Sequence, residues 1–160
     1  MNYIGGFKND LFDGFGIGYY SNKTIFKSMF KNNNLDGYGI LYYSDGGRYE
    51  GEFKNGIREG YGMEYTSSGQ KILEGEWKNG NMDGFVIEYY SSWGKFECEF
   101  KANKRKDGYE KEYLSNGDYL EGELKNNGFN GFGIYYFSNR DILEGEFENG
   151  IIKGYGIFYF

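Results

Sequence analysis

The sequence predicts an all-β protein, an elongated single-layer twisted antiparallel sheet of seven tandem β-hairpin repeats. Three observations predict it: a Gly-aromatic pair recurs at a period of 23–24, residues inside each copy alternate with period two, and helical spacing fits nowhere convincingly. The glycines of this pair are Gly14, Gly37, Gly60, Gly84, Gly108, Gly131 and Gly154. We assign one repeat array to residues 1–160, with copies at approximately 3–25, 26–48, 49–72, 73–95, 96–119, 120–142 and 143–160.

Each copy predicts two strands joined by a tight turn. In the third copy, residues 49–53 alternate an aromatic residue or glycine with glutamate, which is the pattern of a strand with two different faces. Asn55-Gly56 is a strong signal for a two-residue hairpin turn, and residues 61–65 then alternate in the same way. Polar clusters such as Ser67-Ser68-Gly69 supply the second turn, so the chain continues as a meander.

Aromatic residues must form the core, because they make up 22% of the chain and all hydrophobic residues together make up 39%. We expect two rows on one face of the sheet. The first strands supply Phe7, Phe30, Phe53, Trp77, Phe100, Leu124 and Phe147; the second strands supply Tyr19, Tyr42, Tyr65, Tyr89, Tyr113, Tyr136 and Tyr159. A glycine between two bulky residues of the first strand, such as Gly51, leaves a hole that a ring fills.

Composition disfavours several functional classes. With 18 basic against 24 acidic residues, the net charge of −6 disfavours nucleic acid as a partner. Histidine is absent and Cys98 is the single cysteine, so we expect no catalytic thiolate, no metal, no cofactor and no small-molecule substrate. No apolar stretch has the length of a signal or membrane-spanning segment, so we expect a cytoplasmic protein.

The run Tyr-Glu-Gly-Glu-Phe-Lys-Asn-Gly at 49–56, followed by Gly60-Tyr61-Gly62 and Tyr65, resembles the membrane occupation and recognition nexus (MORN) repeat. The resemblance extends over essentially the whole chain. It implies an elongated sheet of hairpins and a non-enzymatic scaffold in a larger intracellular assembly, such as the cytoskeleton or a cilium. It also implies protein contacts, self-association and, more contentiously, contact with phospholipid.

The leading functional hypothesis is a protein-protein interaction scaffold that binds partner segments through an aromatic-lined sheet face, through open sheet edges, or both. A single-layer sheet cannot cover its own aromatic face completely, and tyrosine is well suited to protein interfaces. Self-association by sheet edges fits the same hypothesis. The candidate partner-binding residues are Tyr42, Phe53, Tyr61, Tyr65, Trp77, Phe85, Tyr89, Tyr113 and Tyr136.

Two charged features allow other interpretations. The basic cluster Lys101, Lys104, Arg105 and Lys106 suggests a peripheral membrane adaptor with weak contact to anionic phospholipid, an acidic partner, or a solvated turn. Glu-x-Glu pairs, as at Glu50 and Glu52, have a spacing that suits two-carboxylate hydrolysis or calcium binding. Because the pair recurs in five copies, usually with a lysine after it, a solvated charged face is the preferred interpretation.

The fifth copy departs most from the pattern. Cys98 and Glu110 replace glycines, and one extra residue lies within 101–107. Lys111 occupies a slot that is apolar in the other copies and that we expect on the core face. We therefore expect the aromatic stripe to be kinked or opened here, either as a partner site or as drift in a tolerant loop.

Overall fold

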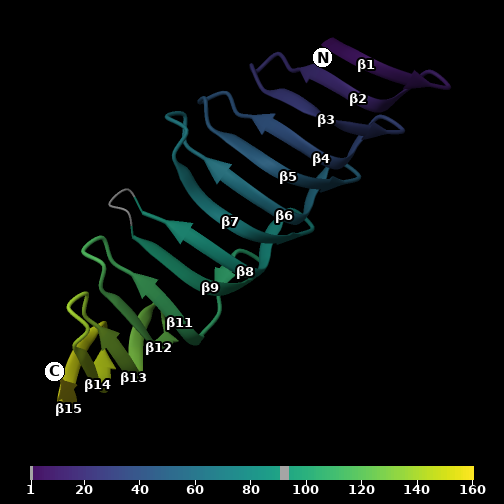
Figure 1. Ribbon diagram of the computed structural model, residues 1–160. Helices are drawn as coiled ribbons and strands as arrows, with labels where there is room; N and C mark the ends of the chain where they lie inside the picture. Colours follow the sequence, from purple (N-terminus) through teal and green to yellow (C-terminus); the bar gives the residue numbers. More distant parts are fainter. Residues whose placement is uncertain (1, 91–93) are drawn as a thin grey trace. The chain divides into compact units, whose positions relative to one another are not determined.

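The computed structural model describes residues 2–90 and 94–160, and it confirms the predicted all-β fold of antiparallel hairpins (Figure 1). Within those ranges no helix is long and apolar enough to cross a membrane. The strands are β1 (Asn2–Lys8), β2 (Leu11–Tyr19), β3 (Ile25–Lys31), β4 (Asn34–Tyr42), β5 (Arg48–Lys54), β6 (Ile57–Tyr65), β7 (Lys71–Lys78), β8 (Asn81–Tyr89), β9 (Lys95–Lys101), β10 (Lys104–Arg105), β11 (Gly108–Tyr113), β12 (Tyr119–Lys125), β13 (Gly128–Tyr136), β14 (Ile142–Glu148) and β15 (Ile151–Tyr159).

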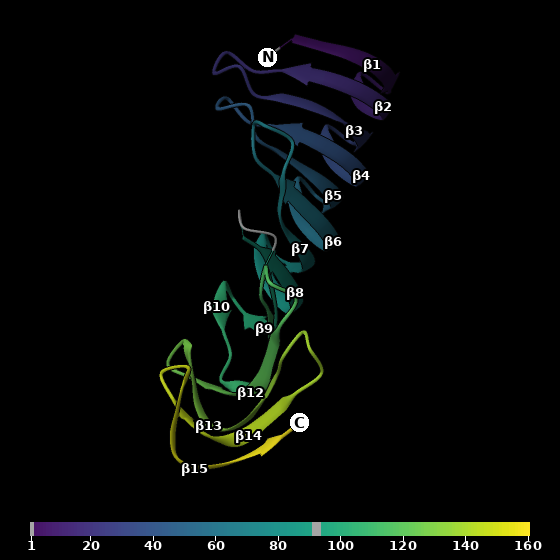
Figure 2. The ribbon, with the colours of Figure 1, turned by 60° about the vertical axis from the view of Figure 1, so that its left-hand side comes forward.

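The chain divides into two compact units, Met1–Asp83 and Gly84–Phe160. In the first unit, β1 to β7 pair antiparallel in chain order. In the second unit, β9 pairs with β8 on one side and with both β10 and β11 on the other, and β11 to β15 then follow in order. Figure 2 shows the short β10 beside β9. Each unit is thus an open sheet made of local pairings.

Two-residue turns close the hairpins. Asn55 and Gly56 both have positive φ, +50° and +82°, as the predicted turn requires. Asparagine and glycine are the residues that adopt this left-handed backbone at least cost, which explains their recurrence at the tips. The equivalent turns with positive φ are Asn9-Asp10, Asn32-Asn33, Asn79-Gly80, Ala102-Asn103, Asn126-Asn127 and Asn149-Gly150.

One face of each sheet, which we call the aromatic core face, buries large side chains. In the first unit Tyr49 and Phe53 lie on it, and Trp77 lies opposite Gly60 on the same side. The buried cluster there is Phe30, Leu35, Tyr49, Phe53 and Trp77. In the second unit the buried hydrophobic residues are Val86, Phe96, Cys98, Phe100, Leu120, Leu124, Phe129 and Phe147. The first predicted aromatic row is thus the core, except that Phe7 near the edge is 62% exposed.

The second predicted row lies on the opposite face, so the expectation that both rows share one face is wrong. Tyr49 pairs with Glu64, whereas Tyr65 pairs with Arg48. Because neighbours along a strand point to opposite sides, Tyr65 lies on the side of Glu50 and Glu52. We call this side the glutamate face. It also carries Tyr42, Tyr89, Tyr113 and Tyr136.

The glycine hole is confirmed for Tyr49, whose ring covers Gly51 on its own strand and Gly62 on the next. A Cβ at Gly51 would lie 2.7 Å from the Cα of Gly62, and a Cβ at either glycine would overlap the phenol. Tyr3 covers Gly5 and Gly16 in the same way and donates a hydrogen bond to the carbonyl of Gly6 at 3.1 Å. Glycine therefore allows the ring to lie flat against the backbone.

Two copies replace the glycine, and in both the preceding ring is phenylalanine. Ser28 follows Phe26, Cys98 follows Phe96, and both small side chains are buried. A phenylalanine lacks the hydroxyl that reaches over the glycine, which leaves room for one small polar atom. Burial raises the pKa of Cys98 to about 12, so its thiol stays protonated, as expected for a structural substitute for glycine.

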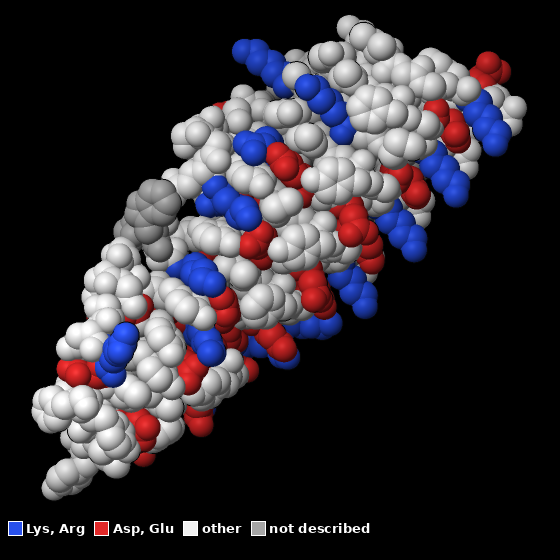
Figure 3. Space-filling view, viewed as in Figure 1, with Lys and Arg blue, Asp and Glu red and all other residues white. Residues whose placement is uncertain are grey.

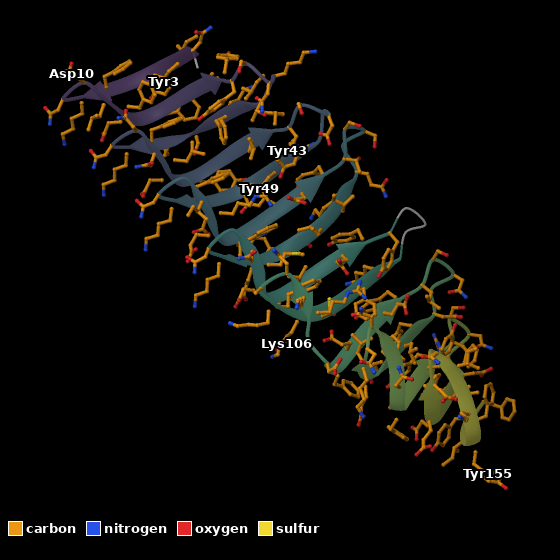
Figure 4. The ribbon with its side chains drawn as sticks, turned by 180° about the vertical axis from the view of Figure 1, so that it is seen from behind. Tyr3, Asp10, Tyr43, Tyr49, Lys106 and Tyr155 are labelled. Carbon is orange, nitrogen blue, oxygen red and sulfur yellow. The ribbon has the colours of Figure 1, made fainter. Side chains whose placement is uncertain are left out.

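Two arginines lie unexpectedly on the aromatic core face. The Arg58 guanidinium carbon is 4.5 Å from the centre of the Tyr49 ring and 4.6 Å from that of Trp77. Arg58 also forms an ion pair with Glu64 at 2.8 Å and donates to the Tyr43 hydroxyl. Figure 4 labels Tyr43 and Tyr49. Stacking and the ion pair together compensate the cost of placing the charge here.

Arg105 repeats this arrangement in the second unit. Its guanidinium carbon lies 4.4 Å from the Phe96 ring centre, and it pairs with Glu88 and with the Tyr90 hydroxyl. Like Arg58, which lies opposite Phe53, Arg105 lies opposite the phenylalanine of its own hairpin, Phe100. The two arginines are therefore equivalent core residues.

The fifth copy is irregular, but not as expected at Lys111. This residue lies on the glutamate face, between Glu97 and Glu121, and forms an ion pair with Glu121 at 2.8 Å. The prediction that Lys111 lies on the aromatic core face is therefore wrong. The cause is again the register between neighbouring strands, which places this position on the glutamate face. The irregularity lies instead where the second strand is split into β10 and β11 around the extra residue, at Lys106 and Asp107.

Candidate interaction face

The glutamate face presents one strongly exposed ring per repeat. It belongs to the residue after the recurring glycine, and each of these rings is at least 47% exposed. In the first unit they are Phe15, Tyr38 and Tyr61; in the second they are Phe85, Tyr109, Phe132 and Tyr155. Figure 4 shows Tyr155 pointing away from the sheet. Exposed aromatic rings in a row are typical of interaction surfaces.

In the third repeat, a bulge in the second strand holds the ring of Tyr61 outward. The pairing of β5 with β6 shifts between Gly51 and Phe53, and Gly60 within the shift has a φ of +69°. The carboxylate of Glu52 lies over Gly60, where an added Cβ would meet it at 2.7 Å, and accepts a hydrogen bond from the backbone N–H of Tyr61 at 3.4 Å. In this repeat Gly60 is therefore needed for the bulge, and the bulge for the exposed ring of Tyr61.

Each exposed ring of the second to the sixth repeat lies directly opposite a glutamate of the next strand. We call these couples ring–glutamate pairs, and they are Tyr38 with Glu52, Tyr61 with Glu76, Phe85 with Glu99, Tyr109 with Glu123, and Phe132 with Glu146. In the first repeat the partner is apolar, because Phe15 lies opposite Met29. Directly opposite side chains have their Cβ atoms about 5 Å apart, so ring and carboxylate face one ligand together.

The two glutamates of each Glu-x-Glu pair have different surroundings. In four of the five pairs the first glutamate binds a neighbouring cation; for example, Glu50 binds Arg48 at 2.5 Å, and Glu74 binds Lys71 at 2.7 Å. Arg48 in turn lies 3.8 Å over the half-buried Tyr65 ring. These contacts hold the half-buried side chains of the glutamate face in place beside the exposed rings.

The second glutamate is the one opposite the exposed ring. Within the described part of the chain, the side chains of Glu76 and Glu146 make no hydrogen bond or ion pair, whereas Glu99 binds Lys106 and Glu123 binds Lys125. Figure 3 shows the acidic side chains interspersed with lysines, arginines and uncharged side chains rather than gathered in one patch. Within residues 2–90 and 94–160, no group of three or more acidic, histidine or cysteine side chains is arranged to hold a metal ion.

Burial and a carboxylate partner keep the phenol of the half-buried Tyr136 neutral. The Tyr136 hydroxyl donates to Glu121 at 2.9 Å, and burial raises the pKa of Tyr136 to about 12. Burial also raises the pKa of the exposed-row residue Tyr61, with Glu74 nearby as a second cause. The face therefore offers π-surfaces and negative charge at neutral pH. A lysine or arginine side chain satisfies both at once, by stacking on the ring and pairing with the carboxylate.

The structure separates the predicted partner-binding residues into three groups. Tyr61 and Phe85 are exposed rings of ring–glutamate pairs. Phe53 and Trp77 are buried on the aromatic core face. The others are half-buried on the glutamate face: Tyr42, Tyr65, Tyr89, Tyr113 and Tyr136. Sequence reasoning missed Tyr38, Tyr109 and Phe132, although their place after the recurring glycine was a usable signal.

The predicted basic cluster does not form one surface. Arg105 lies on the aromatic core face, as described above, and Lys106 binds Glu99. Lys101 and Lys104 lie opposite each other at the end of the β9–β10 pair. Of the four basic residues predicted to bind an anionic partner, only the three lysines thus remain together, around one turn.

Comparisons with known proteins agree with this architecture. A family model described as MORN repeat matches residues 3–24, 26–48, 49–71, 74–95, 121–142 and 144–160. Among solved structures, the TCP domain of SAS-4 (dCPAP) of Drosophila melanogaster, in complex with a proline-rich motif of Ana2 (dSTIL), is similar with a TM-score of 0.58 and 14% sequence identity. The match covers 92% of this chain and 84% of that domain's chain. No curated protein sequence matches significantly.

Proposed function

The chain belongs to the MORN repeat family, and we propose that it is a protein-interaction scaffold that binds a basic, extended segment of a partner protein on its glutamate face. The observation that carries the proposal is the ring–glutamate pair. Tyr61 with Glu76 is the best example in the first unit, because the ring is exposed and its carboxylate has no partner within the described residues. Phe132 with Glu146 is its counterpart in the second unit.

Two further facts support a peptide as the partner. The similar TCP domain has a proline-rich motif of another protein bound to it, so a sheet of this general fold is compatible with peptide binding. The charge of the chain also has the right sign for a basic segment, because its net charge is −6 and the glutamates opposite the rings are part of it. The same charge opposes the alternative of a membrane adaptor, since anionic lipid headgroups would meet acidic side chains. The cytoskeletal or ciliary setting stays a prediction.

Selection from a displayed library of random peptides tests the function. We expect peptides recovered on the full chain to be enriched in lysine and arginine and depleted in aspartate and glutamate. Glu76→Gln and Tyr61→Ser should each reduce the recovery of basic peptides several-fold. Asp10→Asn is the matched control, because it also removes one negative charge but lies in a hairpin turn. Circular dichroism confirms that each variant is folded.

Two results would overturn the proposal. One is a recovered pool without enrichment of basic residues. The other is enrichment that Glu76→Gln and Tyr61→Ser leave unchanged, since binding would then lie elsewhere, for instance on the open sheet edges.

A further inference from the structure

The exposed row in the first unit changes in chemical type from one repeat to the next. It begins with an apolar couple, Phe15 opposite Met29, of which Met29 is 43% exposed. Two ring–glutamate pairs follow, Tyr38 with Glu52 and then Tyr61 with Glu76. A ligand that follows the row meets one apolar position and then two positions that favour a cation.

The spacing of these positions is set by the sheet. Successive rings are two strands apart, and strands lie about 4.8 Å apart, so the row advances by about 9.6 Å per repeat. In a polyproline II helix, three residues form one turn and advance about 9.3 Å, so every third side chain faces the same side. The difference is about 0.3 Å per repeat, which a flexible lysine side chain absorbs.

Other regular conformations fit this spacing less well. A β-strand returns to the same side after two residues, about 6.7 Å. An α-helix does so most nearly after seven residues, about 10.5 Å, and misses by about 0.9 Å per repeat. The polyproline II helix also has no internal hydrogen bonds and a solvated backbone, so it can lie on the side chains of a sheet face without pairing with a strand edge.

We propose, on the basis of the function above, that the unit Met1–Asp83 recognises a polyproline II segment of the pattern apolar-x-x-basic-x-x-basic, running across its strands. The apolar residue contacts Phe15 and Met29, and the two basic residues each bind one ring–glutamate pair. Because a polyproline II helix presents its side chains similarly in both directions, the reversed pattern fits as well. The twist of the sheet, about −20 to −25° per strand, turns the row progressively, so the match is confined to a few repeats.

Fluorescence anisotropy with labelled peptides and the full chain at physiological salt tests the pattern. The probes are Pro-Leu-Pro-Pro-Lys-Pro-Pro-Lys-Pro and its reverse. The control, Pro-Leu-Pro-Pro-Pro-Lys-Lys-Pro-Pro, has the same composition but adjacent lysines. We expect at least one probe to bind about tenfold more tightly than the control, which corresponds to about 1.4 kcal/mol.

A change of specificity provides a test that does not depend on loss of binding. Met29→Glu places a carboxylate opposite Phe15, as in the following repeats, and should be tolerated for that reason. It should bind Pro-Lys-Pro-Pro-Lys-Pro-Pro-Lys-Pro about fivefold more tightly than the unmodified chain does. The leucine-containing probe should bind the variant more weakly.

The possible results distinguish an error in the three-residue peptide spacing from an error in the proposed scaffold function. If the control peptide binds as tightly as the probes and Glu76→Gln weakens all of them, the three-residue spacing is wrong and the scaffold function stands. If Met29→Glu leaves the preference between leucine and lysine unchanged, the assignment of the first position is wrong. If none of the peptides binds, while the library still yields basic sequences that depend on Tyr61, the polyproline II conformation is wrong.

Discussion

The ring of Tyr49 covers Gly51 so closely that a methyl group at position 51 would overlap the phenol. The relationship is reciprocal, since Ser28 and Cys98 stand at the equivalent position only behind phenylalanines. In the copies with a ring at the position of Tyr49, residue size is therefore balanced between two positions of the same strand.

The first prediction follows from this balance. Gly51→Ser should destabilise the protein by about 2 kcal/mol, because the new side chain forces the ring out of place. In the background of Tyr49→Phe the same substitution should cost clearly less, giving a coupling energy of about 1 kcal/mol in a double-mutant cycle. Urea unfolding of the four proteins measures it. Additive costs would show that the hydroxyl does not set the size limit.

The second prediction concerns the half-buried charge of Arg58. Arg58→Leu should destabilise the protein by about 2–3 kcal/mol, because Glu64 loses its ion-pair partner on the aromatic core face. The double variant Arg58→Leu with Glu64→Leu should regain most of this loss, since the second copy has Leu35 and Leu41 at the two equivalent positions. Thermal and urea unfolding measure both variants. A double variant no more stable than the single one would contradict the compensation.

The third prediction is a pH effect at Glu110. This side chain is only 4% exposed, and burial raises its pKa to about 7; the Glu99 carboxylate contributes in the same direction, while the Glu99 backbone N–H, Arg105 and Lys106 oppose it. The folded protein therefore holds this proton more tightly than the unfolded chain does. The contribution of Glu110 to the free energy of unfolding is therefore fully present below pH about 4.5 and falls as the pH rises to about 7.

Glu110→Gln isolates that contribution, because it keeps an oxygen that can accept the Glu99 backbone N–H at 3.3 Å. The stability difference between variant and unmodified chain should grow in favour of the variant from pH 5 to pH 8. Glu112, whose pKa burial also raises, is present in both proteins and cancels. Urea unfolding across this range measures it, and a constant difference would rule out the effect.

The fourth prediction concerns membranes. We expect the chain to stay in the supernatant when vesicles of phosphatidylcholine and phosphatidylserine in a two-to-one ratio are sedimented at physiological salt. Arg105 lies on the aromatic core face, and three lysines around one turn bind such a surface weakly against net negative charge. A lysine-rich peptide serves as the positive control. Sedimentation that disappears when Lys101, Lys104 and Lys106 become glutamate would establish the membrane alternative.

The alternation of residue types along one strand was enough to predict the strands and the glycine hole at Gly51, and the Asn-Gly pair was enough to predict the turn at Asn55-Gly56. It was not enough to place Tyr65, because the face of a second strand depends on the register that turn and bulge set together. The ring–glutamate pairs escaped prediction for the same reason: Tyr61 meets Glu76 only across a register known from the structure.

Arg58 and Arg105 were predictable in principle. They occupy a position that holds Phe12, Leu35 or Met82 in other copies, so a charge there indicated a half-buried arginine with a partner. The sequence alone did not name that partner, which is Glu64 for Arg58 but Glu88, from the preceding hairpin, for Arg105. Partner choice depends on side-chain direction between neighbouring strands.

The break between β10 and β11 limits how such arrays can change length. The extra residue of the fifth copy lies at Lys106 and Asp107, outside the paired strands, so Tyr109 still faces Glu123 and Glu110 still lies opposite Gly122. An insertion of one residue inside a strand would instead exchange the two sides of everything up to the next turn. Single-residue insertions are thus tolerated where pairing is interrupted, while gain or loss of binding positions proceeds by whole hairpins.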